Sequence, residues 1–338
     1  VVDLAAGSSH WWLVGMVLLA GVSQGLLGIW QFGLQPDGPE HFLILGRFYR
    51  AYGTFNQPNP FGGFMNMSAL LGVGVLLGLL SAWWLRRDFQ KKEWRLAGVV
   101  AAATAVAGLG LVFSWSRGAW LGFAAGTAVL LFLWPRRLRW GALLLVGGGL
   151  AAALLWQSGL VPASLSERVT GFVADFQLGD VRGVDINDGN YAVLERLAHW
   201  QAPIDMARDH LWLGVGIGNY EAVYPDYDLI NWPAPLGHAH NYYLNLLAET
   251  GVIGLSAYLA LWGAIIGRTL WVLRRSSWPN RGILLGLMAV WAAFAVHHLV
   301  DKLYVNNIYI HLGVLLGLLA LLAEEVGGAE LVGEVSSS

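Results

Sequence analysis

Long runs of apolar residues recur along the chain and are separated by polar segments. Eight of these runs reach or approach the roughly 20 residues that a helix needs to cross a bilayer. They lie near residues 11–30, 61–85, 96–113, 118–134, 140–156, 251–273, 282–300 and 307–323. Backbone polar groups in hydrocarbon must be satisfied within their own segment, so runs of this length are expected to be helices. The pattern predicts an all-α, polytopic membrane protein with about eight transmembrane helices.

A long polar segment, residues 157–240, separates five of the runs from the other three. It is far longer than a structureless loop in a compact protein, and we therefore expect it to be functional. Apolar residues recur in it at helical spacing and predict an amphipathic helix over Tyr191–Asp209: Val193, Leu197, Trp200 and Ile204. The next stretch, Leu211–Tyr220, is predicted to be a turn. Its three alternate glycines lack the G-x-G-x-x-G spacing and the preceding strand of a nucleotide-binding fingerprint.

The predicted organisation therefore has four parts. Residues 1–156 form an N-terminal block of five transmembrane helices, and residues 157–240 form a large helical loop. Residues 241–323 form a C-terminal block of three transmembrane helices, and residues 324–338 form a cytoplasmic tail. The chain opens V-V-D without methionine and enters an apolar run almost at once, so we expect its natural N-terminus to be missing.

Composition agrees with a membrane protein and excludes several kinds of site. Hydrophobic residues make up 56% of the 338 residues and charged residues only 12%, which is more apolar surface than one soluble core could bury. Cysteine is absent, which excludes disulfides, thiolate nucleophiles and cysteine metal sites. The sequence has no Walker loop, no zinc helix and no basic patch for nucleic acid. We therefore expect a lipid bilayer, and no nucleic acid, among its partners.

Positive charges are concentrated in alternate short loops between the apolar runs. Twelve of the 20 lysines and arginines lie there: Arg86, Arg87, Lys91, Lys92, Arg95, Arg136, Arg137, Arg139, Arg268, Arg274, Arg275 and Arg281. By the positive-inside rule these loops face the cytoplasm. The long segment 157–240 and the short segments 31–60, 114–117 and 301–306 then face outward, into the periplasm or the outside.

Two outward arginines are candidate anion ligands. Arg117 lies between two apolar runs, where an arginine usually faces a wet cavity and an anion, although it could also be a snorkelling anchor. Arg196 lies on the predicted helix and could bind a phosphate through two parallel N–H groups. Alternatively, it could form an ion pair within the helix, on a solvated face with Glu195 and His199. Beyond Arg117, a face of small residues is predicted to be a packing seam: Gly118, Gly122 and Gly126.

Two histidines, His238 and His240 in G-H-A-H-N, precede the sixth apolar run. Imidazole titrates near neutral pH, so a histidine near the membrane surface can act as a general base. Metal binding is the alternative, but the sequence shows no complete ligand set. A hydrogen-bonded interfacial histidine is the plainest alternative. Further polar residues complete the outward set, either as ligands or as parts of ordered turns: Arg50, Asn59, Asn241 and Asp301.

Four motifs, in this order, resemble the O-antigen ligase and O-antigen polymerase superfamily. They are G-T-F-N-Q-P-N-P-F-G-G, F-S-W-S-R-G-A-W-L-G, E-R-L-A-H-W-Q-A-P-I-D-M-A-R-D-H-L-W-L-G-V-G-I-G-N-Y and G-H-A-H-N-Y-Y-L-N-L-L-A-E-T-G-V-I-G-L. The similarity runs from about Arg50 to the last apolar run. The family usually has about four more spans before the first motif, which agrees with a missing N-terminus.

The resemblance implies a glycosyltransferase of the bacterial inner membrane, with its active site on the periplasmic side. Such an enzyme moves a glycan from undecaprenyl diphosphate to a sugar hydroxyl with inversion, without metal, cofactor or nucleotide sugar. By this resemblance His240 is the essential histidine and general base, and Arg117 and Arg196 bind the diphosphate. Weaker substrate-binding roles are expected for another five residues: Arg50, Asn59, His238, Asn241 and Asp301.

Ligases of the superfamily place the glycan on lipid A core, and we expect this reaction here. Polymerases extend an O-antigen or exopolysaccharide repeat with the same motifs, and they are the first alternative. Because homologues have been labelled as bicarbonate transporters, transport of bicarbonate or another small anion is the alternative from a different class. A carrier should show internal repeats and broken helices at the bilayer midplane, which the sequence does not indicate. A non-catalytic partner in polysaccharide export is a further alternative.

Overall fold

The computed structural model describes residues 10–87, 91–170, 181–187 and 190–337. Residues 171–180 and 188–189 of the predicted outward segment, and residue 338 of the predicted tail, lie outside the described residues. The described chain is largely helical. The long helices are α2 (Trp11–Gly33), α3 (Pro58–Arg86), α4 (Lys91–Phe113), α5 (Arg117–Leu133), α6 (Leu138–Gln157), α8 (Tyr191–Asp209), α10 (Tyr242–Arg275), α11 (Asn280–His297) and α12 (Ile308–Ser337). The short elements are η1 (Glu40–Phe42), β1 (Leu43–Ile44), β2 (Phe48–Tyr49), α7 (Ala163–Thr170), α9 (Tyr220–Val223) and η2 (Tyr224–Asp226).

The predicted all-α membrane class is confirmed. Within the described residues, seven helices are long and apolar enough to cross a membrane: α2, α3, α4, α6, α10, α11 and the part of α12 up to Gly328. The remaining apolar run forms α5, which is apolar but has 17 residues. All eight predicted runs are therefore helical, and the protein is a multi-pass membrane protein.

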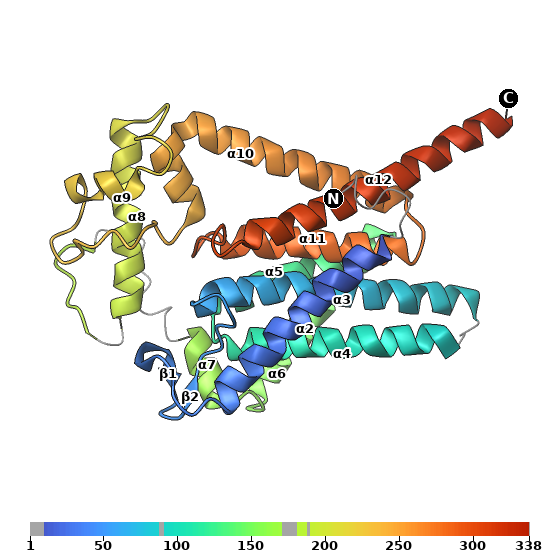
Figure 1. Ribbon diagram of the computed structural model, residues 1–338, viewed down its shortest axis with the longest axis horizontal. Coiled ribbons are helices and arrows are strands. Elements are labelled where there is room, and N and C mark those ends of the chain that lie inside the picture. The colour runs from blue at the N-terminus through green and yellow to red at the C-terminus, as the bar shows by residue number, and fades with distance from the viewer. Residues whose placement is uncertain (1–9, 88–90, 171–180, 188–189, 338) are drawn as a thin grey trace. The chain divides into compact units, whose positions relative to one another are not determined.

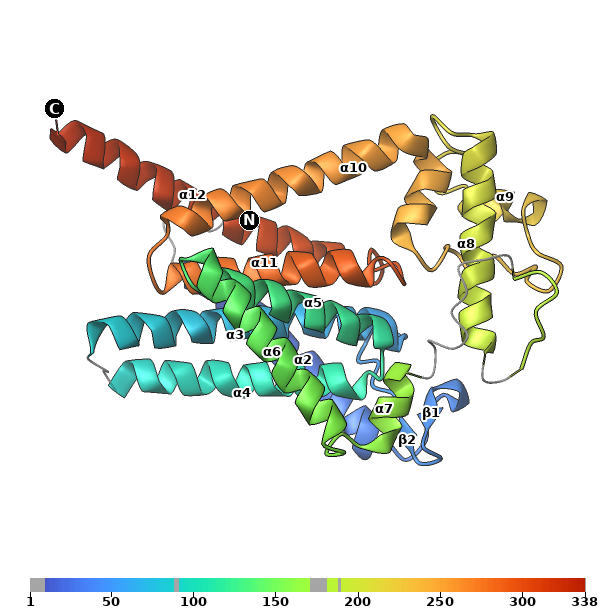
Figure 2. The same ribbon diagram turned by 180° about the vertical axis from the view of Figure 1, so that it is seen from behind.

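The chain divides into two compact units, which are described separately. The first, here called the membrane-helix unit, consists of Val1–Leu145, Ile265–Val296 and Leu303–Ser338. In it α3 packs against α4 and α5, and α2 packs against α3, α4 and α12. Both views show α3 and α4 running side by side (Figure 1, Figure 2).

Glycines let helices of the membrane-helix unit approach closely. A Cβ on Gly122 would lie 2.8 Å from the carbonyl oxygen of Ala293, and a Cβ on Gly126 would lie 2.6 Å from that of Ala289. The predicted small-residue seam of α5 is thus in contact with α11. Because lipid gives no hydrophobic drive for helices to associate, such close backbone packing holds the helices together.

The second unit, here called the loop unit, consists of Val146–Ala264 and His297–Lys302. Helix α8 is central to it and has the predicted bounds, Tyr191–Asp209. Its buried side chains enter two apolar clusters. The first consists of Val181, Val193, Leu194, Leu197, Ala198, Leu229 and Trp232. The second consists of Ala202, Met206, Tyr220, Tyr224, Ala239 and Ala248.

Helix α10 is broken at Gly251, where the backbone turns to φ 64° and ψ −168°. The glycine-rich turn after α8 fills the break. The N–H groups of Val215 and Gly216 donate to the carbonyls of Ala248 and Glu249, at 2.8 and 2.9 Å. Across the break, Val252 N–H donates to Leu211 O at 2.9 Å. Non-helical backbone within an apolar span is tolerated only where protein or water satisfies it, and here the turn satisfies it.

Glycine is required on both sides of this contact. A Cβ on Gly214 would lie 2.4 Å from the carbonyl oxygen of Ala248, and a Cβ on Gly251 would lie 2.3 Å from that of Trp212. Both residues also have positive φ. Gly214, the first of the alternate glycines in the L-W-L-G-V-G-I-G stretch, is therefore explained by this backbone contact, and the stretch forms the predicted turn.

Candidate functional site

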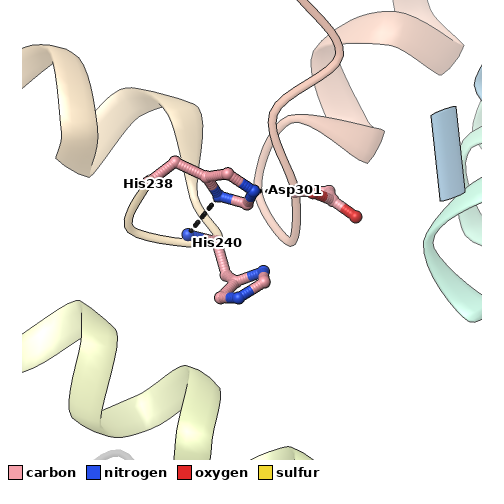
Figure 3. A group of neighbouring side chains, drawn as sticks. All are labelled: His238, His240 and Asp301. Carbon is pink, nitrogen blue, oxygen red and sulfur yellow. Dashed lines mark hydrogen bonds and ion pairs between the residues drawn. The ribbon is translucent and has the colours of Figure 1, made fainter. Parts of the chain in front are cut away.

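Three predicted site residues lie together in the loop unit. His238 and His240 precede α10, and Asp301 lies in the turn after α11. Figure 3 shows the ring of His238 between His240 and Asp301. The ring centroids of His238 and His240 are 4.4 Å apart, at an interplanar angle of 69°. The Nε2 atom of His238 lies 4.0 Å from Oδ1 of Asp301.

The contacts of His238 define its tautomer. Its Nδ1 atom accepts a hydrogen bond from the backbone N–H of His240, at 3.0 Å. A neutral imidazole that accepts at Nδ1 carries its proton on Nε2, so the N–H of His238 faces the carboxylate. Asp301 is only 5% exposed, and its Oδ1 also accepts the backbone N–H of Lys302 at 2.8 Å. Asp301 is therefore placed to orient His238 and, through it, the backbone of His240.

His240 is half-buried, and its two ring nitrogens are buried without a hydrogen bond to the described part of the protein. Neither Nδ1 nor Nε2 makes a hydrogen bond to a described residue. The ring contacts His199 edge to face, with centroids 5.7 Å apart, and its backbone has φ 50°. The carbonyl of His240 accepts the indole N–H of Trp200 at 3.3 Å. The imidazole is thus fixed by packing and by its backbone, and neither nitrogen is committed to a hydrogen bond with a described residue.

The asparagines around His240 hold the loop in place. The side-chain oxygen of Asn241 accepts the N–H groups of Tyr243 and Leu244, at 3.0 and 3.1 Å, and so caps α10. The buried Asn245 accepts the N–H of Ala239 at 3.1 Å. The cap of Asn241 thus fixes the backbone that directly follows His240. The sequence analysis missed Asn245, although an amide in the apolar run Y-Y-L-N-L-L was a signal.

Helix α8 brings Arg196 and His199 to the same cluster. His199 is buried, and its ring nitrogens lie 2.7 Å from the carbonyl of Glu195 and 2.9 Å from that of Ala234. The positive charge of Arg196 is close enough to lower the pKa of both His238 and His240. A fixed cation near a neutral imidazole is an arrangement suited to an anionic leaving group.

Burial is the main cause that lowers the pKa of both histidines. It lowers the pKa of His240, as do His238 and Arg196, whereas Asp301 opposes the change. Burial likewise lowers the pKa of His238. Burial alone would raise the pKa of Asp301, but the imidazoles of His297, His238 and His240 and the Lys302 N–H hold it below its usual value. At neutral pH both histidines are therefore neutral and Asp301 is ionised.

These shifts predict an unusual pH dependence. A general base works in its neutral form, so activity falls as the pH drops below its pKa. A histidine of ordinary pKa, about 6.5, would lose about tenfold in rate at pH 5.5. Because the pKa of His240 is lowered, we expect kcat/KM for transfer to stay nearly constant between pH 7.5 and about pH 5.5. Measured pH profiles check this, and a midpoint at or above 6.5 would contradict it.

His238, His240 and Asp301 also offer three possible metal ligands. One ligand atom from each lies within 4.8 Å of the others. Zinc binds nitrogen and oxygen at about 2.0–2.2 Å, which places neighbouring ligand atoms about 3.3 Å apart in a tetrahedron. The 4.0 Å between His238 Nε2 and Asp301 Oδ1 is wider. Metal binding would therefore need these side chains to move together.

The membrane-helix unit holds a second group of predicted site residues around the S-W-S-R motif. The guanidinium of Arg50 donates from Nε to Ser114 O at 3.0 Å and from Nη2 to Asn59 Oδ1 at 3.2 Å. Asn59 lies in the first turn of α3, which begins at Pro58 and so starts before the predicted residue 61. Prolines 58 and 60 therefore lie in the first helical turn, where proline is tolerated.

Arg117 is the first residue of α5, and Ser116 is its N-cap, accepting the N–H of Ala119 at 3.3 Å. Helix N-termini carry partial positive charge and free N–H groups, and so they favour anions. The arginine adds a full charge at the same place. This group thus combines two guanidinium side chains with a helix N-terminus, which suits a phosphate-bearing ligand.

Comparison with known proteins supports the resemblance seen in the motifs. Residues 102–259 match the family described as O-antigen ligase. The matched range contains Arg117, Arg196, His238 and His240, and three of the four motifs. No curated protein matches the chain. The match supports glycan transfer of the ligase or polymerase type in a membrane setting, and residues 102–259 are similar to the O-antigen ligase family.

Proposed function

We propose that the protein is an inverting glycosyltransferase of the ligase type. It transfers a glycan from undecaprenyl diphosphate to a sugar hydroxyl of an acceptor such as lipid A core, at the periplasmic face of the bacterial inner membrane. The observation that carries the proposal is the His238–His240–Asp301 cluster, in which a half-buried, neutral imidazole has two ring nitrogens that make no hydrogen bond to a described residue. The family match supports the same class of chemistry.

In the proposed reaction His240 is the general base. It takes the proton of the acceptor hydroxyl while the hydroxyl oxygen forms a bond to the anomeric carbon. The bond between that carbon and the phosphate oxygen breaks, and undecaprenyl diphosphate leaves with the bonding electrons. A positioned base is worth about 10²- to 10⁴-fold in rate. Asp301 and His238 position the base through the contacts described above.

The arginines are proposed to bind the diphosphate and stabilise its growing negative charge. Arg196 has this role because its charge acts on the histidine cluster. Arg117 has it because of its S-R-G motif and its place at the N-terminus of α5. Arg50, held by Ser114 and Asn59, is proposed to add a phosphate contact. Fixed cations in a poorly hydrated site contribute as much as a general base or more.

Mass spectrometry of lipid-linked products tests the proposal. The purified chain, in vesicles, is incubated with an undecaprenyl diphosphate glycan and candidate acceptors. Glycan moved en bloc to lipid A core or to another acceptor is the expected result. A ladder of repeats that stays on the carrier would instead identify a polymerase. No transfer across a broad acceptor set, together with bicarbonate flux into the same vesicles, would replace the enzyme with a transporter.

A chelator separates the metal-free mechanism from a metal-dependent one. We expect EDTA to leave the transfer rate unchanged, because neutral His240 accepts the proton without help from a metal. If EDTA abolished transfer and added Zn²⁺ restored it, the proposal of a metal-free base would be wrong. The histidine–aspartate cluster would then be assigned as a metal site.

A further inference from the structure

A polar cavity lies in the membrane-helix unit, apart from the charged groups assigned above. Its volume is about 460 Å³, within the range of roughly 300–1,000 Å³ typical of small-molecule sites. Helix α2, the loop before α3 and the start of α12 form its wall. The polar side chains that line it include Gln24, Thr54, Asn56, Asn306 and Asn307.

The wall of the cavity is held in place by amide hydrogen bonds. The Oε1 atom of Gln24 accepts from the backbone N–H of Thr54 at 3.0 Å and from its hydroxyl at 3.2 Å. The side-chain amide of Asn306 donates to the carbonyl of Phe55. The buried Gln31 accepts the N–H groups of Tyr52 and Gly53, at 3.0 and 2.6 Å. The loop before α3 is therefore fixed, as a binding site requires.

Three of the lining asparagines have left-handed backbones. The φ angles are 59° for Asn56, 50° for Asn306 and 62° for Asn307. Asparagine adopts this conformation more readily than most residues, but glycine does so without strain. Side chains are thus present at three positions where the backbone itself favours glycine. Such outliers concentrate at functional sites, which makes their amide groups candidate ligand contacts.

The chemistry of the lining selects a class of ligand. Among the described residues no carboxylate, lysine or arginine lines the cavity, which disfavours a diphosphate or another ion. Amide groups supply both donors and acceptors, as hydroxyl groups need. The Oδ1 atom of Asn307 accepts the hydroxyl of Tyr309 at 2.9 Å, so its NH₂ group is the part of the amide that would donate to a ligand. Buried Phe55 and Phe64 add apolar surface for the carbon face of a ring.

We propose that this cavity binds a neutral sugar residue. The amide-rich wall, which has no carboxylate, lysine or arginine among the described residues, and the two phenylalanines carry the inference, together with the imidazole of His311 as a further hydrogen-bonding group and a volume that admits a sugar ring. That the sugar is part of the glycan substrate rests on the proposed function. The sugar could belong either to the donor glycan or to the acceptor, and the two sources share the same chemistry.

Binding of simple glycosides tests the proposal without any need for transfer. Saturation-transfer NMR on the full 338-residue chain in detergent is measured with methyl glycosides of glucose, galactose and N-acetylglucosamine, and with a methyl glucuronide. We expect at least one neutral glycoside to bind and the charged glucuronide to bind more weakly. Binding of none of the neutral glycosides, or stronger binding of the glucuronide, would overturn the proposal.

Two variants place the binding in the cavity. Ser23→Trp fills it from α2, where the serine hydroxyl bonds only to Ala20 O of its own helix among the described residues, and it should abolish the signal. Gly15→Trp is the matched control, because the structure leaves open space around the Gly15 Cβ on the same helix. Asn307→Gly keeps the left-handed backbone and removes the amide, which should weaken binding about three- to tenfold. Unchanged binding in Ser23→Trp would refute the site.

Transfer kinetics then separate the two sources of the sugar. If the cavity holds the acceptor, Asn307→Gly raises the acceptor KM by the same factor and leaves the donor KM unchanged. If it holds the donor glycan, the donor KM rises instead. Either result supports the cavity as a sugar site. Sugar binding without any transfer by the native chain would refute the proposed function and leave the sugar site standing.

Discussion

Replacement of His240 with asparagine is expected to abolish glycan transfer while the protein still folds. Asparagine tolerates the left-handed backbone at this position, where φ is 50°. It has no group that accepts a proton near neutral pH, so the whole contribution of a general base is lost, about 10²- to 10⁴-fold in rate. Alanine would add backbone strain and confuse stability with catalysis. Single-turnover transfer, followed by mass spectrometry, measures the loss.

His210→Asn is the matched control for this prediction. His210 is exposed at the C-terminal end of α8, in the same unit, and receives the same chemical change. Its variant should transfer glycan at the native rate. A general base contributes at least about 10²-fold in rate. If His240→Asn kept more than about a tenth of the native rate, His240 could not be that base. His238, which faces Asp301, would then be the next candidate.

Replacement of Arg117 with lysine is expected to lower transfer by about 10²-fold, the usual cost of removing one aligned donor to a developing anion. Lysine keeps the charge but loses the planar fork that binds two phosphate oxygens at once. Arg117 directly follows the N-cap residue Ser116, so the start of α5 fixes the backbone of Arg117. The loss should be mainly in kcat, because the charge grows as the diphosphate leaves.

Arg95→Lys is the matched control, since Arg95 is an exposed arginine of α4 in the same unit. It should leave transfer unchanged. If Arg117→Lys were as active as Arg95→Lys, Arg117 would be an anchor of the helix end, the alternative that the sequence left open. An equal loss of activity in both variants would show that the effect is not specific to the Arg117 site.

The helices could be predicted from the sequence because lipid imposes a simple rule on long apolar runs. All eight runs became helices, and the spacing of apolar residues gave α8 its bounds. The start of α3 at Pro58 was missed because the predicted run begins after the two prolines, although proline is accepted in a first helical turn. The break in α10 was missed because apolar periodicity carries no information about backbone angles at Gly251.

The sequence singled out candidate site residues one by one, but it showed which of them lie together only where they are neighbours in the chain. His238 and His240 lie two residues apart, and the sequence pointed to both. The approach of Asp301 to His238 depends on how the turn after α11 folds back, which no local pattern encodes. The hydrogen bonds from Arg50 to Ser114 and Asn59 likewise join segments distant in sequence. The roles proposed for these residues in transfer stay predictions until the variants are measured.

The contact between the glycine-rich turn and the break in α10 constrains how this protein could be recombined with its relatives. The turn at Leu211–Gly216 and the helix at Ala248–Ile253 satisfy one another's backbone groups, and neither side has room for a Cβ at its central glycine. A chimera that exchanges only residues 157–240 would place a relative's turn against the unchanged break in α10. Backbone N–H and C=O groups at the break would then lack partners within an apolar span. The two segments should therefore be transplanted as one cassette, with the crossover placed beyond Ile253.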